Sequence, residues 1–176
     1  MKQHQGFTLI ELIITIAIAG ILTSMAVPNF SKLMQKNKMT SLHNELLSSL
    51  SLTRNLAISR GSFATLCKSN PAGTDCSSSA SWNDGWIVFS DKNNDGTVDS
   101  GEDIIAVNNN LPKGVTISYA KNRVTYGAQG YAQGYSGTFT FCDQRASGEE
   151  KKGMVISNNG HIRVATSATE LGECQN

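Results

Sequence analysis

The sequence contains few of the residues that build active sites or strongly charged surfaces. It has 3 histidines, 3 prolines and 2 tryptophans in 176 residues, and 15 Lys plus Arg nearly balance 14 Asp plus Glu, for a net charge of +1. That balance excludes an argument from bulk charge for a dedicated nucleic-acid protein. There is no P-loop, no HExxH and no G-x-G-x-x-G after a strand, and no histidine stands near an evident nucleophile or acid. We therefore predict no catalytic residues, no cofactor and no enzymatic activity.

The composition is that of one ordinary folded domain. Hydrophobic residues make up 39% of the chain, charged residues 16% and aromatic residues 7%, with 16 glycines, which excludes a collagen-like, low-complexity or charged disordered chain. The 4 cysteines fit neither paired zinc knuckles nor a CxxC redox site. An even number of cysteines in an exported chain indicates two disulfides.

One long apolar run lies near the N-terminus. After a short polar stretch, residues 7–27 (FTLIELIITIAIAGILTSMAV) are almost unbroken in apolar character, and as a helix they cover roughly 30 Å, the thickness of a bilayer's hydrocarbon. They therefore predict one transmembrane helix. The alternative is a secretory signal peptide cut near Ser24–Ala26. Glu11 argues against it, because a carboxylate at the centre of a membrane helix costs roughly 2.5–3.5 kcal/mol and such groups are usually paired and functional.

The start of this run is more specific than its length. The string Gly6-Phe7-Thr8-Leu9-Ile10-Glu11 resembles the motif of type IV prepilins, which type IV pilins share with the pseudopilins of type II secretion. The resemblance implies that prepilin peptidase removes residues 1–6 as a leader, and that the new amine of Phe7 is methylated. Glu11 then serves assembly, because its carboxylate can neutralise the amine of a neighbouring subunit inside a fibre. The implied partners are the peptidase, the inner membrane and other pilins or pseudopilins.

A second helical segment is expected at residues 28–60. Pro28 removes one backbone donor from the helix, so we predict a kink there. Beyond it, apolar residues recur at about 3.6-residue spacing, which predicts an amphipathic helix as far as about Arg60. Gly61 is the predicted stop. The apolar face of this segment is expected to pack on the protein's own sheet.

After Gly61 the pattern changes to short β-type runs separated by turn residues. These runs are Ser62–Cys67, Gly85–Ser90, Asp103–Val107, Val115–Tyr119, Arg123–Tyr126, Thr138–Cys142, Met154–Ser157 and His161–Ala165. Short connections favour antiparallel pairing, so residues 61–176 are predicted to form a β-rich globular head. The predicted fold class is α+β, with a long N-terminal helix packed on an antiparallel sheet, as in type IV pilins. Segments 70–81 and 127–137 are predicted loops, and the second contains a short Gln-Gly-Tyr echo.

The resemblance places the head in the periplasm before assembly and in the pilus fibre afterwards. The periplasm is oxidising, so disulfides persist there. Four cysteines allow three connectivities. We favour Cys67 with Cys76, which closes a short loop, and Cys142 with Cys174, which ties a late strand to a C-terminal tail that has few other apolar anchors.

One acidic segment matches a calcium loop as a string. Residues 91–102 (DKNNDGTVDSGE) have oxygen-bearing side chains at the ligand positions Asp91, Asn93, Asp95, Asp99 and Glu102. The runs on either side look like strands, whereas the calcium-binding hand needs two helices. An acidic hairpin loop made of turn-forming residues is the favoured interpretation, and calcium binding is the alternative.

Four segments, taken in order, resemble the minor pilins of the GspH/FimT family. They are Trp82–Asp91, Gly101–Glu102, Phe139–Arg145 and Met154–Arg163. Some members of that family bind DNA through a C-terminal Gly-Arg-x-Arg motif. Here Gly160 and Arg163 match, and His161 stands where the first arginine would be. With Lys151 and Lys152, these residues are the candidates for binding double-stranded DNA.

Charge is distributed unevenly along the chain. Residues 75–103 carry 7 acidic residues against Lys92, a net of −6, and residues 104–163 carry 7 basic against 3 acidic, a net of +4. The sequence as a whole predicts a minor type IV pilin that enters a pilus at its tip or in its initiation complex. Two alternatives are a DNA-binding minor pilin for natural transformation and a minor pseudopilin of type II protein secretion.

Overall fold

The structure, a computed structural model, describes residues 8–109, 111–143 and 151–174. By its internal contacts the chain divides into an N-terminal unit that ends at Asn37 and a head unit, Lys38–Asn176. One helix, α1 (Leu9–Arg60), begins in the first unit and ends in the second. The backbone is helical through position 28, and the bend at Pro28 stays a prediction.

Within the head unit, α1 buries one face. Met39, Leu42, Leu46, Leu50 and Ala57 are all fully buried. Their spacing of three, four or seven residues places them along one side of a helix. The predicted amphipathic segment is therefore confirmed for this part of α1.

A glycine cap ends the helix at Arg60. Gly61 has a φ of +61°, a left-handed conformation that glycine adopts without a Cβ penalty. The N–H of Gly61 donates to the carbonyl of Ile58 at 3.3 Å, and the N–H of Ser62 donates to the carbonyl of Ala57 at 3.2 Å. These two bonds form a Schellman motif, and the predicted stop at Gly61 is confirmed.

The head unit contains two four-stranded antiparallel sheets. The first has the order β3-β2-β1-β5 and is built from β1 (Ala64–Lys68), β2 (Trp86–Ser90), β3 (Ile104–Asn108) and β5 (Arg123–Tyr126). The second has the order β4-β6-β7-β8 and is built from β4 (Val115–Ser118), β6 (Gly137–Asp143), β7 (Lys151–Ile156) and β8 (Ile162–Val164). Two short 3₁₀ helices, η1 (Trp82–Asp84) and η2 (Ala168–Glu170), complete the elements.

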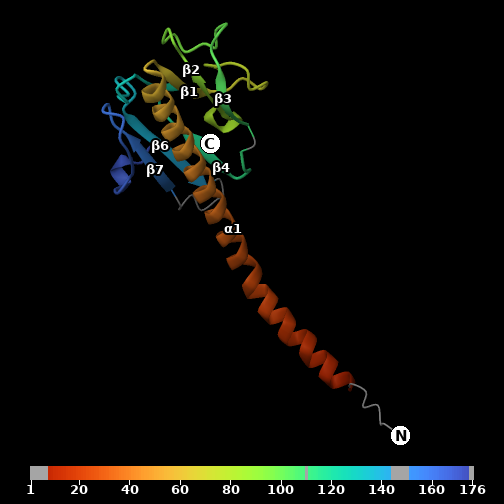
Figure 1. The fold of residues 1–176 in the computed structure, drawn as a ribbon. Coiled ribbons are helices and arrows are strands. Elements are labelled where there is room, and N and C mark those ends of the chain that lie inside the picture. The colour runs from red at the N-terminus through yellow and green to blue at the C-terminus, as the bar shows by residue number, and fades with distance from the viewer. Residues whose placement is uncertain (1–7, 110, 144–150, 175–176) are drawn as a thin grey trace. The chain divides into compact units, whose positions relative to one another are not determined.

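One hydrophobic core joins the end of α1 to both sheets, and Figure 1 shows this part of the helix lying across β6 and β7. Buried side chains of β1, β2, β4, β5, β6 and β7 meet the apolar face of the helix. Trp86 Nε1 of β2 donates to Ser49 Oγ of α1 at 2.9 Å. Phe139 of β6 stacks on Tyr119 with ring centroids 4.0 Å apart. The core therefore holds the sheets and the helix in one unit.

The first sheet is also covered on its outer face. Cys67, Ile87 and Phe89 form a smaller buried cluster against which Cys76, Val98 and Ile104 pack. Cys76 and Val98 belong to the loops that follow β1 and β2. Because side chains of a strand alternate between faces, covering both faces explains why every residue of β2 is buried.

The structure agrees with the predicted fold class and differs in two details. The prediction of a single sheet is wrong, because β5 returns to pair with β1 while β4 pairs with β6, and local patterns do not specify such long-range pairings. The predicted start of the seventh strand at Met154 is also wrong. β7 begins at Lys151, since its polar end pairs with Cys142 of β6.

Candidate assembly helix and head surfaces

The helix of the N-terminal unit exposes an apolar surface. Its large aliphatic side chains between Leu9 and Val27 are 51% to 76% exposed. In the part of the chain that the structure describes, α1 is the one helix long and apolar enough to cross a membrane. Each Å² of apolar surface left in water costs roughly 25 cal/mol, so this surface requires lipid or other apolar helices around it.

Glu11 is the one charged residue between Leu9 and Val27. It lies in the first turn of α1, where the partial positive charge of the helix N-terminus stabilises a carboxylate. Its backbone N–H donates to Thr8 Oγ1 at 3.3 Å, which caps the helix. The side chain of Glu11 is exposed and can meet a group from another molecule. The predicted cleavage site, Gly6 and Phe7, lies outside the described residues.

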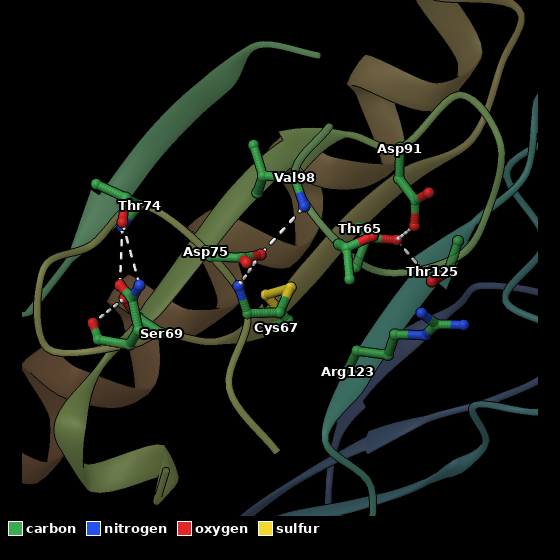
Figure 2. Close-up of a disulfide and its surroundings, with 12 residues drawn as sticks. Thr65, Cys67, Ser69, Thr74, Asp75, Asp91, Val98, Arg123 and Thr125 are labelled. Atoms are coloured by element: carbon green, nitrogen blue, oxygen red, sulfur yellow. Dashed lines mark hydrogen bonds between the residues drawn. A yellow bond between two sulfur atoms is a disulfide. The ribbon is translucent and has the colours of Figure 1, made fainter. Parts of the chain in front are cut away.

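Two disulfides join segments of the head unit, with the pairings favoured from the sequence. Cys67 of β1 bonds to Cys76, and Cys142 of β6 bonds to Cys174 near the C-terminus. Figure 2 shows the first bridge with Asp75 beside it. Asp75 Oδ1 accepts from the N–H of Cys76 at 2.7 Å and from the N–H of Val98 at 3.1 Å. The disulfide loop and the acidic loop are therefore held together over the first sheet.

The two ends of the calcium-like loop are fixed by hydrogen bonds. Asp91 is fully buried, and its Oδ2 accepts from Thr65 Oγ1 of β1 at 2.6 Å (Figure 2). The carboxylate of Glu102 accepts from the backbone N–H groups of Lys92, at 2.6 Å, and Asp99, at 3.2 Å. The first and last of the candidate ligands thus anchor the loop to the sheet and close its neck.

The middle of that loop is also bonded internally. Asn93 Nδ2 donates to the carboxylates of Asp95, at 2.9 Å, and Asp99, at 2.8 Å. Hydrogen bonds from the hydroxyl and the N–H of Thr97 hold the pKa of Asp95 below its ordinary value. Across residues 8–109, 111–143 and 151–174, no group of three or more His, Cys, Asp or Glu side chains is placed to hold a metal ion. The strands on either side of the loop, β2 and β3, pair antiparallel, which agrees with the hairpin-loop interpretation.

The structure separates the two candidate DNA-binding lysines. Both belong to β7, where successive side chains point to opposite faces of the sheet. Lys152 shares the face of the buried Met154, and its Nζ donates to Thr40 Oγ1 of α1 at 2.6 Å. Lys151 is exposed and lies on the other face. Only one of the pair is therefore presented to solvent on the outer surface of the sheet.

The other candidates surround the turn between β7 and β8. Gly160 has a φ of +78°, and His161 beside it is exposed. Arg163 lies in β8, where both of its terminal nitrogens bond the carboxylate of Glu170 in η2. The hydrogen bonds and charge of Arg163 lower the pKa of Glu170 to about 2. The guanidinium of Arg163 is thus paired with a carboxylate of the same chain, while Lys152 bonds α1, so two of the five candidates are engaged within the head unit.

His43 of α1 is a polar residue that the structure buries. His43 is 8% exposed, and its ring centroid lies 5.2 Å from that of Phe141. Its Nε2 has no hydrogen-bond partner among the described residues. Burial lowers the pKa of His43 below its ordinary value of 6.5. A hydrogen bond with Asn44 raises this pKa in part, and the charge of Lys152 lowers it slightly. Position 43 follows Met39 by four residues and precedes Leu46 by three, so helical spacing could have identified it.

We expect acid to destabilise the head unit through His43. Because its pKa is lower in the folded state than the ordinary 6.5, the unfolded chain takes up this proton first, and stability falls as the pH drops below 6.5. Thermal unfolding between about pH 7.5 and about pH 5 should show a smaller loss of Tm for His43→Leu than for the wild type. His161→Leu, at an exposed position, should retain the wild-type loss. Equal losses for wild type and His43→Leu would contradict this role.

The described chain combines an exposed apolar helix, which has one carboxylate near its start, with an α+β head unit that has two disulfides. This combination is typical of pilin-like structural proteins. The sequence model of the family described as type II transport protein GspH matches residues 43–160, and that of the prokaryotic N-terminal methylation motif matches residues 1–27. The chain belongs to the GspH family, and it is a type IV pilin-like protein with an N-terminal methylation motif.

Individual relatives agree with this assignment. The type IV major pilin protein PilA of Myxococcus xanthus (strain DK1622) is 46% identical over 44 residues, which are 25% of this chain and 20% of that protein. The type IV major alpha-pilin of Moraxella bovis is 46% identical over 46 residues, 26% of this chain and 29% of that protein. The chain thus matches less than a third of the length of these curated relatives.

Solved structures extend the likeness over most of the chain. The type IV minor pilin FimU of Pseudomonas aeruginosa (strain PAO1) aligns with a TM-score of 0.55 at 18% identity, covering 74% of this chain and 90% of that one. A second crystal form of FimU aligns with a TM-score of 0.50. At this identity the likeness concerns the fold alone.

Proposed function

We propose that the chain is a minor type IV pilin. Prepilin peptidase cuts it between Gly6 and Phe7, and the helix from Phe7 to Val27 holds it in the inner membrane with the head unit in the periplasm. It then enters a pilus, at the tip or in the initiation complex. The observation that carries the proposal is the exposed apolar helix with one carboxylate, Glu11, inside a matched methylation motif.

Glu11 is proposed to direct assembly by charge. A carboxylate in an apolar surrounding is costly unless it has a partner, and the new amine of Phe7 on a neighbouring subunit supplies the opposite charge. The pair neutralises both groups when the helices bundle, whereas removal of one partner leaves an uncompensated buried charge. The mechanism is therefore association of helices, and it needs no catalytic group.

The Glu11→Ala variant tests this proposal. We expect peptidase processing close to that of the wild type, because the charge of Glu11 matters only when another subunit is near. Incorporation into sheared pili should fall to about a tenth or less, since an unpaired buried charge costs about 3 kcal/mol or more. Processing is measured by mass spectrometry of the N-terminus, and incorporation by immunoblotting of the pilus fraction.

Two further variants sharpen that test. Glu11→Gln keeps the size of the side chain without its charge, so it should resemble Glu11→Ala. Glu45→Ala removes an exposed glutamate farther along the same helix and should assemble as the wild type does. Normal incorporation of Glu11→Ala would refute the pairing mechanism, and a mature chain that starts near Val27 would refute the membrane-anchored pilin itself.

A minor pseudopilin of type II secretion is the second candidate, and the description of the matching family favours it. Both candidates use the same helix and the same processing. They differ in the fibre that they enter. A deletion strain scored for twitching, secretion and DNA uptake together separates them, because a pilus subunit affects the first and a pseudopilin affects the second.

Double-stranded DNA as a ligand receives less support. Phosphate binding needs cations that are free to replace counterions, and Arg163 is already paired with Glu170 while Lys152 bonds α1. Lys151 and His161 are the exposed members of the candidate set. DNA binding is therefore the third candidate, and a salt-dependent gel shift with the full-length protein measures it.

A further inference from the structure

The Gln-Gly-Tyr echo of the loop between β5 and β6 forms two similar turns. The echo consists of Gln129-Gly130-Tyr131 and Gln133-Gly134-Tyr135. The central glycines have φ values of +77° and +82°, a region that residues with a Cβ rarely occupy. The repeated glycine thus gives both copies the same backbone conformation at their centres.

Both copies line one pocket of about 460 Å³ at the surface of the head unit. Each contributes its glutamine and its tyrosine, and Phe63 and Asn94 lie among the other lining residues. No residue in the lining carries a formal charge. The volume is within the range of sites for small ligands, roughly 300–1,000 Å³.

The loop that forms the pocket is held in place by bonds from several elements. Arg54 Nε of α1 donates to the carbonyl of Gly130 at 3.1 Å, and Arg123 Nε of β5 donates to the hydroxyl of Tyr135 at 3.0 Å. Lys121 Nζ donates to the carbonyls of Gly134 and Ser136. The pocket is therefore formed before a ligand arrives, which lowers the entropic cost of binding.

Three polar side chains of the pocket are free for a ligand. Within the described residues, the side chains of Gln129, Gln133 and Tyr131 take part in no hydrogen bond, and Tyr131 is 51% exposed. Each amide offers one acceptor oxygen and two donor hydrogens, and the phenol offers both functions. The face of an exposed aromatic ring is electron-rich and attracts weakly positive C–H groups.

We propose that this pocket binds a neutral oligosaccharide. A sugar ring has an apolar C–H face that fits a tyrosine ring, and a rim of hydroxyl groups that both donate and accept, as the glutamine amides do. A nucleic acid or an acidic glycan would need cations in the lining, and a lipid chain would need a lining without free amides. Two Gln and Tyr pairs in one pocket suit a chain of sugar units, with Tyr131 as the exposed stacking ring and Tyr135 held in place by Arg123. This binding is independent of assembly through α1.

The test uses the full-length protein in a detergent that has no sugar headgroup. A panel of neutral, sialylated and sulfated oligosaccharides is screened by saturation-transfer NMR, and the affinity of those that bind is measured by titration. We expect neutral members to bind with a Kd below about 10 mM. Tyr131→Ala should weaken this binding by about tenfold or more, because the loss of one stacking contact changes the Kd on that scale.

Controls separate the pocket from the fold. Tyr131 is exposed, so its variant should keep the wild-type Tm, and Gln133→Ala supplies a second test at another exposed position. Val164→Ala removes an exposed side chain from the other sheet and should leave affinity unchanged. The proposal is overturned if no neutral oligosaccharide binds, if only charged ones bind, or if both pocket variants bind as the wild type does.

Discussion

A Gly160→Ala variant is expected to lose about 3 kcal/mol or more of its unfolding free energy, as the sum of a left-handed backbone cost and an overpacking cost. Gly160 has a φ of +78°, and a Cβ there would lie far inside van der Waals distance of the carbonyl oxygen of Gly130. It would also lie 3.2 Å from Tyr126. Because the nearest obstacle is backbone, a rotamer change cannot relieve it. Urea unfolding followed by tryptophan fluorescence measures the loss.

Gly134→Ala is the matched control for this effect. Gly134 has a φ of +82°, close to that of Gly160, and nothing lies within 4 Å of the position of its Cβ. It should therefore lose only the conformational cost, about 1–2 kcal/mol. If the two variants lose equal stability, the close approach of Gly130 to Gly160 is not what constrains position 160.

The contact between Gly160 and Gly130 also affects how Gly160 is interpreted as a candidate DNA-binding residue. Gly160 is one of the two positions that match the DNA-binding motif of some family members, and the contact with Gly130 explains a glycine there without a ligand. A loss of DNA binding in Gly160→Ala would then report a change in the fold. The exposed residues Lys151 and His161 are the better positions at which to measure any contribution to DNA binding.

Elements that depend on neighbours in the sequence could be predicted. The end of α1 at Gly61 depends on one residue's tolerance of positive φ, and the buried stripe from Met39 to Ala57 depends on helical spacing. Each of the eight predicted β runs overlaps a strand of the structure. The motif around Glu11 is likewise local, because six consecutive residues carry it.

What could not be predicted depends on pairings between distant segments. Nothing in the run from Arg123 to Tyr126 indicates that it pairs with β1 rather than with β4, and that choice produces two sheets. The bonds from Lys152 to Thr40 and from Arg163 to Glu170 also arise only in the folded chain. For this reason the five candidates for DNA binding, which the sequence suggests as one basic group, have different environments in the structure. The pocket formed by the Gln-Gly-Tyr echo was missed for the same reason, because Phe63 and Asn94 come from other segments.

Removal of the Cys142–Cys174 disulfide should cost more stability than removal of Cys67–Cys76. The bridged residues are 32 apart in the first case and 9 in the second. Since a crosslink restricts the unfolded chain more when it closes a longer loop, the expected losses are about 3.5–4 kcal/mol and about 2.5–3 kcal/mol respectively. Replacement of each pair by serine, with urea unfolding of the oxidised proteins, gives both values.

The two serine variants are matched in burial, which makes their difference informative. In each pair the cysteine in the strand is buried and its partner is partly buried, so the cost of placing serine at these sites largely cancels. The tail retains other anchors, including the bond from the N–H of Gly172 to Thr140 Oγ1 at 2.9 Å. Without its bridge this bond should open more often, and amide exchange at Gly172 should accelerate while exchange in α1 changes only with global stability. Equal losses in the two variants would show that the length of the closed loop does not set the contribution of these crosslinks.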